Sequence, residues 1–288
     1  MLPFYMVDVF AREKYSGNQL AVVRGKEKLD SETMQKIARE INFSETTFIP
    51  LNSPEEDSWE VRIFTPEEEV PFAGHPTLGT AYVLREKIIK KPMERLELKT
   101  KAGSIPVSFE GDMVWMRQNP PQFGPCYNGE ELAPVLGLTP EDIDSRYPAQ
   151  EVSTGLPFVI IPLKGLSALK QARIDRERYF KFISGKNAKS LVVFAPEGYS
   201  GETDMSVRVF AEYYGVPEDP ATGSANGCLN GYLLQHRYGG EEEVDIKVDQ
   251  GWEVGRPSLL LLQGQEIGSQ KEIRVGGRVI STGSGYLE

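Results

Sequence analysis

The chain contains two stretches that repeat one pattern at a fixed separation of 146 residues, close to half of its 288 residues. The matched segments are SETTFIP at 44 and SLVVFAP at 190, VRIF at 61 and VRVF at 207, and VP at 70 and 216. A self-match at a fixed period is typical of repeated architecture. We therefore expect two domains of related fold.

Composition sets the class of protein. Hydrophobic residues make up 40% and charged residues 26% of the chain, as in a folded globular protein. A net charge of -10 argues against a nucleic-acid partner, which would require clustered lysine and arginine. The first residues lack a basic and an apolar region, no apolar run approaches the length of a membrane span, and two cysteines imply no disulfide framework. We expect a cytoplasmic protein that binds no membrane.

Short strand patterns dominate, separated by a few helix patterns. Residues 31–41 predict an amphipathic helix capped by Asp30 or Ser31, and 76–88 and 221–236 predict buried helices. The order of strands favours an α+β fold with an antiparallel sheet around one internal helix in each half, rather than two open parallel sheets. We expect the Gly-rich run from Gly276 to form turns of a final hairpin.

The Pro- and Gly-rich segment 119–130 is predicted to be the domain linker. We accordingly place the N-terminal domain at 1–120, completed by a C-terminal strand at about 275–288. The C-terminal domain then covers 121–274.

In both copies a loop rich in small residues leads into the buried helix, as AGHPTLGT from Ala73 and as DPATGSAN from Asp219. A helix start exposes backbone N–H groups, and small residues let a ligand approach them closely. Each loop is therefore a candidate binding place for a carboxylate. Two such helix starts facing each other would form an anion pocket between the domains.

The acid–base residues of the two copies differ. The fixed separation pairs Glu45 with Leu191, His75 with Ala221 and Asp219 with Ala73. Each titratable group thus has an inert counterpart, as expected for one asymmetric site at which a carboxyl or imidazole moves a proton.

Structural explanations remain open for these groups. Glu45 could be a cap or an exposed strand residue, His75 could be structural, and Asp219 could be the N-cap of the second buried helix. No spacing of His and Cys predicts a metal site, and no nucleophile elbow or phosphate loop is present in the sequence.

Four motifs occur in one order along the whole chain: GNQLAVV, INFSETTFI, FTPEEEVPFAGHPTLG and EDPATGSA. Their combination resembles the phenazine-biosynthesis PhzF-like family of the diaminopimelate-epimerase-like fold. The resemblance implies two pseudo-symmetric domains, each a rolled antiparallel sheet around a central helix. It also implies a homodimeric, cofactor-free isomerase with its active site in the cleft between the domains.

The resemblance carries over to particular positions. It assigns Glu45 as the catalytic acid/base and His75 and Asp219 as its supporting groups. The expected substrate-binding residues are Asn18, Ser44, Gly74, Thr77, Thr222, Gly223 and Ser224. No metal ligand is expected.

Racemase relatives use two facing cysteines, one before each buried helix. Here Cys126 falls in the predicted linker and Cys228 inside a helix, so chemistry with two thiols does not fit. We expect an isomerase that moves a proton along a small unsaturated or carbonyl-bearing carboxylic acid. The alternatives are an epimerase, racemase or lyase of an amino or hydroxy acid, and a non-catalytic binding protein.

Overall fold

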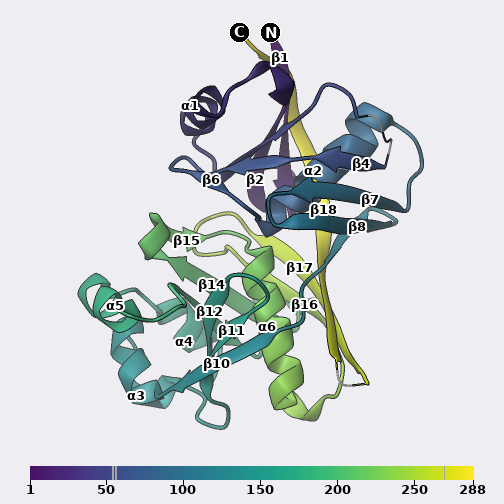
Figure 1. Ribbon diagram of the computed structural model, residues 1–288. Helices are drawn as coiled ribbons and strands as arrows, with labels where there is room; N and C mark the ends of the chain where they lie inside the picture. Colours follow the sequence, from purple (N-terminus) through teal and green to yellow (C-terminus); the bar gives the residue numbers. More distant parts are fainter. Residues whose placement is uncertain (54, 56, 269) are drawn as a thin grey trace. The chain divides into compact units, whose positions relative to one another are not determined.

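The computed structural model describes residues 1–53, 55, 57–268 and 270–288. The chain divides into two compact units (Figure 1). Unit 1 consists of residues 1–117 and 276–288, and unit 2 consists of residues 118–275. Both ends of the chain therefore belong to unit 1.

In unit 1, strands lie on both sides of the buried helix α2 (Gly74–Val83), which contacts β1, β2 and β3 as well as β7, β8 and β9. The other helical segments are η1 (Lys26–Lys28), α1 (Ser31–Ile41) and the π-helical turn η2 (Leu84–Ile89). The strands are β1 (Leu2–Val9), β2 (Asn18–Arg24), β3 (Glu45–Ile49), β4 (Ser58–Glu60), β5 (Arg62–Phe64), β6 (Glu69–Val70), β7 (Arg95–Thr100), β8 (Gly103–Glu110), β9 (Met113–Arg117) and the C-terminal part of β18 (Gln270–Leu287).

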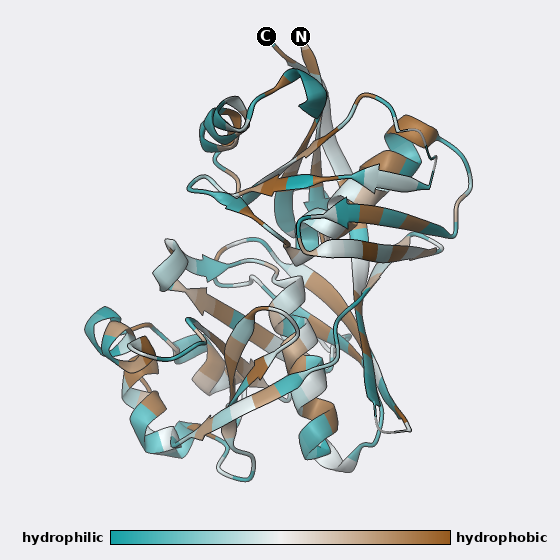
Figure 2. Cartoon of the chain, viewed as in Figure 1, coloured by the Kyte–Doolittle hydropathy of each residue, from teal (hydrophilic) through white to brown (hydrophobic). Residues whose placement is uncertain are grey.

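The helices of unit 1 follow from their sequences. The Asp30 side chain accepts a hydrogen bond of 2.7 Å from the Thr33 backbone N–H, and α1 buries Met34 and Ala38 on one side. Figure 2 shows the rest of α1 as largely hydrophilic. The helix predicted at 31–41 is thus confirmed, with Asp30 as its cap. By contrast, α2 is buried all round, as expected for a central helix.

Unit 2 repeats this plan around the buried helix α6 (Gly223–His236), which contacts β11, β12, β16 and β17. Its other helical segments are α3 (Gly129–Leu132), η3 (Ala133–Leu136), η4 (Pro140–Asp142), α4 (Leu166–Gln171), α5 (Arg176–Ile183), η5 (Glu212–Tyr214) and η6 (Tyr238–Gly240). Its strands are β10 (Gln122–Tyr127), β11 (Ala149–Ser153), β12 (Pro157–Pro162), β13 (Ser190–Ala195), β14 (Met205–Ala211), β15 (Val216–Asp219), β16 (Val244–Gln250), β17 (Ser258–Ile267) and the start of β18.

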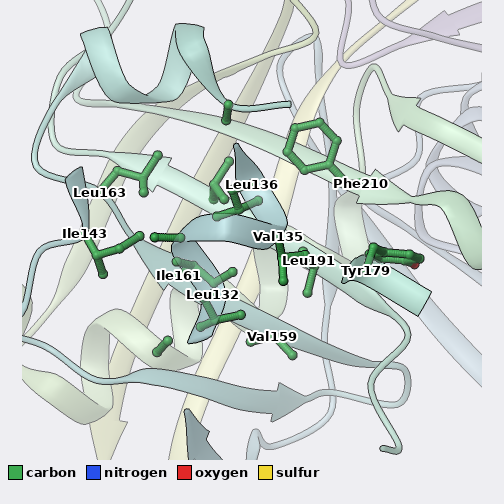
Figure 3. Packing of buried hydrophobic residues seen from close by; sticks show 14 of the residues in the cluster. Leu132, Val135, Leu136, Ile143, Val159, Ile161, Leu163, Tyr179, Leu191 and Phe210 are labelled. Atoms are coloured by element: carbon green, nitrogen blue, oxygen red, sulfur yellow. The ribbon is translucent and has the colours of Figure 1, made fainter. Parts of the chain in front are cut away.

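The short helices of unit 2 cover an apolar cluster on the side of β13 opposite α6. Figure 3 shows Leu132, Leu136, Leu163 and Leu191 packed together in this cluster. Full burial of one such side chain stabilises the fold by roughly 1.5–3 kcal/mol. The cluster therefore holds α3, α4 and α5 onto the sheet.

Strand directions are mostly antiparallel, as predicted, but parallel neighbours also occur. The parallel pairs include β2–β3, β4–β7, β12–β13 and β14–β16. In the first pair α1 connects the two strands, and α4 and α5 connect β12 to β13. A helical connection returns the chain to the same end of the sheet, which gives parallel neighbours.

The predicted linker at 119–130 is wrong in its middle, because residues 122–127 form β10 and pair with β11. The ladder shifts register between Phe123 and Cys126, around Pro125. Such an irregularity lets a strand accommodate a proline, which cannot donate a ladder hydrogen bond. A high content of Pro and Gly therefore did not mark a linker in this segment.

The Gly-rich run from Gly276 does not form hairpin turns, because it lies within the continuous strand β18. A Cβ atom on Gly276 would lie 2.4 Å from the Trp115 ring, and one on Gly283 would lie 2.8 Å from Met6. These glycines thus allow close packing of large side chains against the strand. The first buried helix also begins at Gly74, two residues before the predicted Pro76.

No helix within the described residues combines the length and apolar character that a membrane crossing requires.

Candidate functional site

Unit 1 brings together Glu45 and His75, two of the three predicted catalytic residues. Glu45 is the first residue of β3 and His75 the second residue of α2. The His75 Nε2 atom lies 3.5 Å from Glu45 Oε2, and the two side chains are only 5% and 18% exposed. A carboxyl and an imidazole are therefore in contact at a place with little exposure to solvent.

His75 is neutral at physiological pH. Burial lowers its pKa to about 3, although a hydrogen bond to the backbone carbonyl of Gln19 acts in the opposite direction. His75 Nε2 lies 3.3 Å from that carbonyl oxygen, which can only accept, so the ring proton lies on Nε2. The contact with Glu45 is consequently not an ion pair, and His75 is a neutral hydrogen-bond donor.

Of the predicted substrate-binding residues of unit 1, Ser44 and Gly74 adjoin this pair along the chain, and Asn18 precedes Gln19, whose carbonyl contacts His75. Asn18 is buried at the start of β2, Ser44 immediately precedes β3, and Gly74 begins α2. The Thr77 hydroxyl donates a hydrogen bond of 2.8 Å to the Ala73 carbonyl within the helix, and its oxygen can still accept one from a ligand. The proton of this hydroxyl is thus used within the first turn of α2.

Unit 2 holds the third predicted catalytic residue, Asp219, at the end of β15. Its Oδ2 atom accepts a hydrogen bond of 2.5 Å from the Thr222 hydroxyl. Asp219 is not the helix cap, since the N-cap of α6 is Thr222 and no side chain caps that helix start. Gly223 and Ser224 form the first turn of α6, so the described part of this helix start presents small residues, as predicted.

Gln250 is a buried residue that the sequence analysis missed. It ends β16 and is 1% exposed, and its amide contacts both Asp219 and Thr222. The available signal was weak: a glutamine before a glycine at the end of the strand pattern IKVDQ. Only the structure shows that this strand end lies beside the start of α6.

The structure corrects the counterpart of Glu45 in the repeat. The fixed separation pairs Glu45 with Leu191, but Leu191 packs in the outer cluster of unit 2, whereas Glu45 faces α2 and His75. The strand pairings also match Leu191 with Thr46, the residue after Glu45. Leu191 pairs with Phe210, and Thr46 pairs with Phe64, the equivalent of Phe210 in unit 1. The counterpart of Glu45 is therefore Ser190.

The counterpart of Asp219 also changes. Asp219 pairs with Val209, and at the equivalent position in unit 1 Val70 pairs with Ile63. The segment before Asp219 is longer than its equivalent in unit 1 and includes the η5 turn. Val70, rather than Ala73, is thus the counterpart of Asp219.

Alignment of the helix starts gives the third counterpart. Gly74 begins α2 and Gly223 begins α6, which pairs His75 with Ser224 rather than with Ala221. The three corrected counterparts carry no acid or base. Each of the three titratable residues thus has an inert counterpart in the other unit, as predicted, but the counterparts are different residues.

The two cysteines differ in environment. Cys126 is exposed on β10, whereas Cys228 is buried inside α6, where burial raises its pKa to about 12. A thiol that resists ionisation is a poor acid/base at neutral pH. In the described part of the chain, no group of three His, Cys, Asp or Glu side chains lies together in a way that could hold a metal ion.

A surface hollow of about 810 Å³ lies elsewhere in unit 1, lined by residues that include Arg85, Lys90 and Phe109. None of the predicted site residues lines it.

Known proteins resemble this chain over nearly its full length. The family model for phenazine biosynthesis-like proteins matches residues 7–285. A trans-2,3-dihydro-3-hydroxyanthranilate isomerase of Pseudomonas aeruginosa is 35% identical over 295 residues, which cover 99% of each chain. An uncharacterized isomerase of Clostridium acetobutylicum is 33% identical, over 96% of this chain and 94% of that protein. The crystal structure of a PhzF-family phenazine biosynthesis protein of Bacillus anthracis superimposes with a TM-score of 0.90 at 29% identity, covering 100% of this chain and 99% of that one.

These similarities define the class of protein first: an isomerase with an α+β fold. More narrowly, the chain belongs to the phenazine biosynthesis-like, or PhzF-like, family. The fold class and the family resemblance predicted from the sequence motifs are both confirmed.

Proposed function

We propose that this protein is a cofactor-independent isomerase that moves a proton along a small unsaturated or carbonyl-bearing carboxylic acid. The observation that carries the proposal is the contact between Glu45 and a neutral, buried His75. The isomerase activity in the name of the relative from Pseudomonas aeruginosa supports the same reaction type.

In the proposed reaction, Glu45 is the proton carrier. Its carboxylate removes a proton from an activated carbon, so that the C–H bond breaks, a Glu45 O–H bond forms and the electron pair enters the conjugated system. Glu45 then delivers a proton, part of which has exchanged with water, to a different carbon, which shifts the double bond and restores the carboxylate. Such acid/base catalysis contributes typically 10²–10⁴ in rate.

His75 and Asp219 support this transfer. The Nε2 hydrogen of the neutral His75, which the Gln19 carbonyl accepts in this structure, is shared during the reaction with the oxygen that gains charge, where a fixed donor stabilises the transition state. Asp219 orients a polar group of the same substrate.

The backbone N–H groups at the start of α2 and at the start of α6 are proposed substrate-binding groups, as are Asn18, Ser44, Thr77, Thr222 and Ser224. We also expect the protein to act as a homodimer in the cytoplasm, without a metal or cofactor.

The test is mass spectrometry of small acids incubated with the protein in deuterated water, with product formation followed in parallel. The first probe is trans-2,3-dihydro-3-hydroxyanthranilate, and proline-like and diaminopimelate-like acids follow. Glu45→Gln should lower the rate by at least 10² while the protein remains folded. Glu97→Gln, at an exposed position of β7, is the control and should retain full activity.

Each result has a clear meaning. Full activity of Glu45→Gln would refute the assignment of Glu45. Deuterium exchange at a single stereocentre without a double-bond shift would identify an epimerase instead. Binding of an acid without exchange or product would identify a binding protein.

A further inference from the structure

The side-chain amide of Gln250 lies at the centre of the hydrogen bonds that hold the Asp219 loop. Its Nε2 atom lies 2.8 Å from the Asp219 carbonyl and 3.0 Å from the Thr222 hydroxyl. Its Oε1 atom accepts hydrogen bonds from the Thr222 backbone N–H at 3.2 Å and from Asn226 Nδ2 at 2.8 Å. One buried side chain thus connects β16, the Asp219 loop and the first turn of α6.

Two backbone groups fix the orientation of this amide. The Asp219 carbonyl can only accept and the Thr222 N–H can only donate, so the nitrogen and oxygen of Gln250 cannot be exchanged. The Gln250 NH₂ group therefore donates to the Thr222 hydroxyl oxygen. The single hydroxyl hydrogen of Thr222 is then directed at Asp219 Oδ2, 2.5 Å away.

We propose that Gln250 is a positioning residue that orients the Thr222 hydroxyl toward Asp219 and thereby keeps Asp219 in its carboxylate form. A donated hydrogen bond favours the charged form of a carboxyl group, because that form is the stronger acceptor. Asp219 then serves as a hydrogen-bond acceptor for the substrate, whereas Glu45 carries the proton. This division of roles rests on the proposed function.

The backbone around Gln250 is built for this contact. Gly251, the next residue, has a φ of 78°, and a Cβ atom there would lie 2.5 Å from the Pro220 carbonyl. Only glycine adopts this conformation in so little space without strain. The close approach brings the end of β16 against the loop that carries Asp219.

Other charged groups lie around the loop. Arg208 on β14 forms two hydrogen bonds with Glu218, of 2.9 and 2.7 Å, and lies 3.8 Å from Glu253. Asp249 on β16 accepts hydrogen bonds from the Tyr199 backbone and Thr203. Arg256 lies in the loop after β16, with its carbonyl next to Gly251. These groups are unchanged in the variants below, so their effect on Asp219 cancels in a comparison.

The test follows the Asp219 carboxyl directly by ¹³C NMR of the full-length protein labelled at aspartate carboxyl carbons. The Asp219→Asn variant identifies the signal by its loss. Gln250→Met removes the amide while keeping an unbranched side chain, and Thr222→Val removes the hydroxyl. Each should raise the titration midpoint of Asp219 by about one pH unit, the effect of one hydrogen bond to a charged group.

The decisive comparison is the double variant. If Gln250 acts through Thr222, then Gln250→Met added to Thr222→Val should produce no further shift. Thr222→Ser keeps the hydroxyl and should titrate like the wild type. Gln150→Met is the matched control, since Gln150 is also a buried glutamine of unit 2 and bonds a backbone carbonyl; it should leave the midpoint unchanged.

An unchanged midpoint in Gln250→Met, or an equal shift in the presence and absence of the Thr222 hydroxyl, would overturn the inference. If Gln250→Met does not fold, equal midpoints in Thr222→Val and Thr222→Ser would overturn it as well. The titration needs no substrate. If the titration gives the expected shifts but the protein exchanges no proton with any acid tested, only the proposed function is contradicted.

Discussion

His75 should make the stability of unit 1 depend on pH. Its pKa is about 3 in the folded protein because of burial, against 6.5 for an ordinary histidine. Below pH 6.5 the unfolded chain binds a proton that the folded chain does not bind, so stability is lost as the pH falls from 6.5 toward 3. The loss from this residue alone is about 1.4 kcal/mol at pH 5.5 and about 3 kcal/mol at pH 4.5.

Urea unfolding followed by circular dichroism at pH 8 and at pH 5.5 measures this effect. Both values lie above the pI of about 5.0, so the protein keeps its net negative charge. The variant is His75→Gln, whose amide can still donate toward the Gln19 carbonyl. Its loss of unfolding free energy between the two pH values should be smaller than that of the wild type by about 1.4 kcal/mol.

His236→Gln is the control. Burial also lowers the pKa of His236, but this histidine is only half-buried and should give a smaller effect. Titrating carboxylates are shared by all three proteins and cancel. If wild type and His75→Gln lost the same free energy, His75 would not be held neutral, and its role as a neutral donor would be refuted.

Three further changes test the packing around the site. Thr47→Val should lower the free energy of unfolding in urea by about 1–3 kcal/mol, because it leaves the buried Thr80 hydroxyl without its partner at 2.8 Å. The double variant Thr47→Val with Thr80→Val should lose less than the two single variants together. Gly79→Ala should lower stability by about 1–3 kcal/mol, since its Cβ would lie 2.5 Å from a side chain of β2, and a gain in Tm would contradict this packing. Glu218→Leu should cost about 3 kcal/mol because the buried Arg208 loses its two short hydrogen bonds, and an unchanged Tm would contradict that.

Local signals in the sequence were sufficient for some elements. Asp30 before an apolar stripe predicted α1 with its cap, because capping and periodicity depend only on neighbouring residues. The small, apolar residues of 221–236 likewise predicted a buried helix, and α6 is buried.

Register could not be predicted in the same way. The match of Ser44 with Ser190 follows residue identity, whereas the strand pairings make Glu45 the structural counterpart of Ser190. A shift of one residue turns a strand side chain to the other face, and the sequence pattern does not reveal such a shift. The difference in acid–base residues between the two copies was nonetheless predicted, because none of the corrected counterparts is an acid or base.

Contacts between distant segments were also beyond the sequence. Gln250 lies 31 residues after Asp219, and nothing in IKVDQG marks it as a partner of that loop. The pairing depends on how β16 and β14 lie side by side.

The path of the chain has a consequence for the order of events during synthesis on the ribosome. Unit 2 is one continuous segment, whereas β1, at the very start of unit 1, pairs with residues 279–287 at the very end of the chain. β1 is made before all of unit 2 and must therefore wait for residues 279–287 before this edge of its sheet is complete. Domains commonly fold from the N-terminus onward as they are made. In this protein unit 2 can fold first, and a ribosome stalled before residue 279 would leave β1 paired with β2 but not with β18.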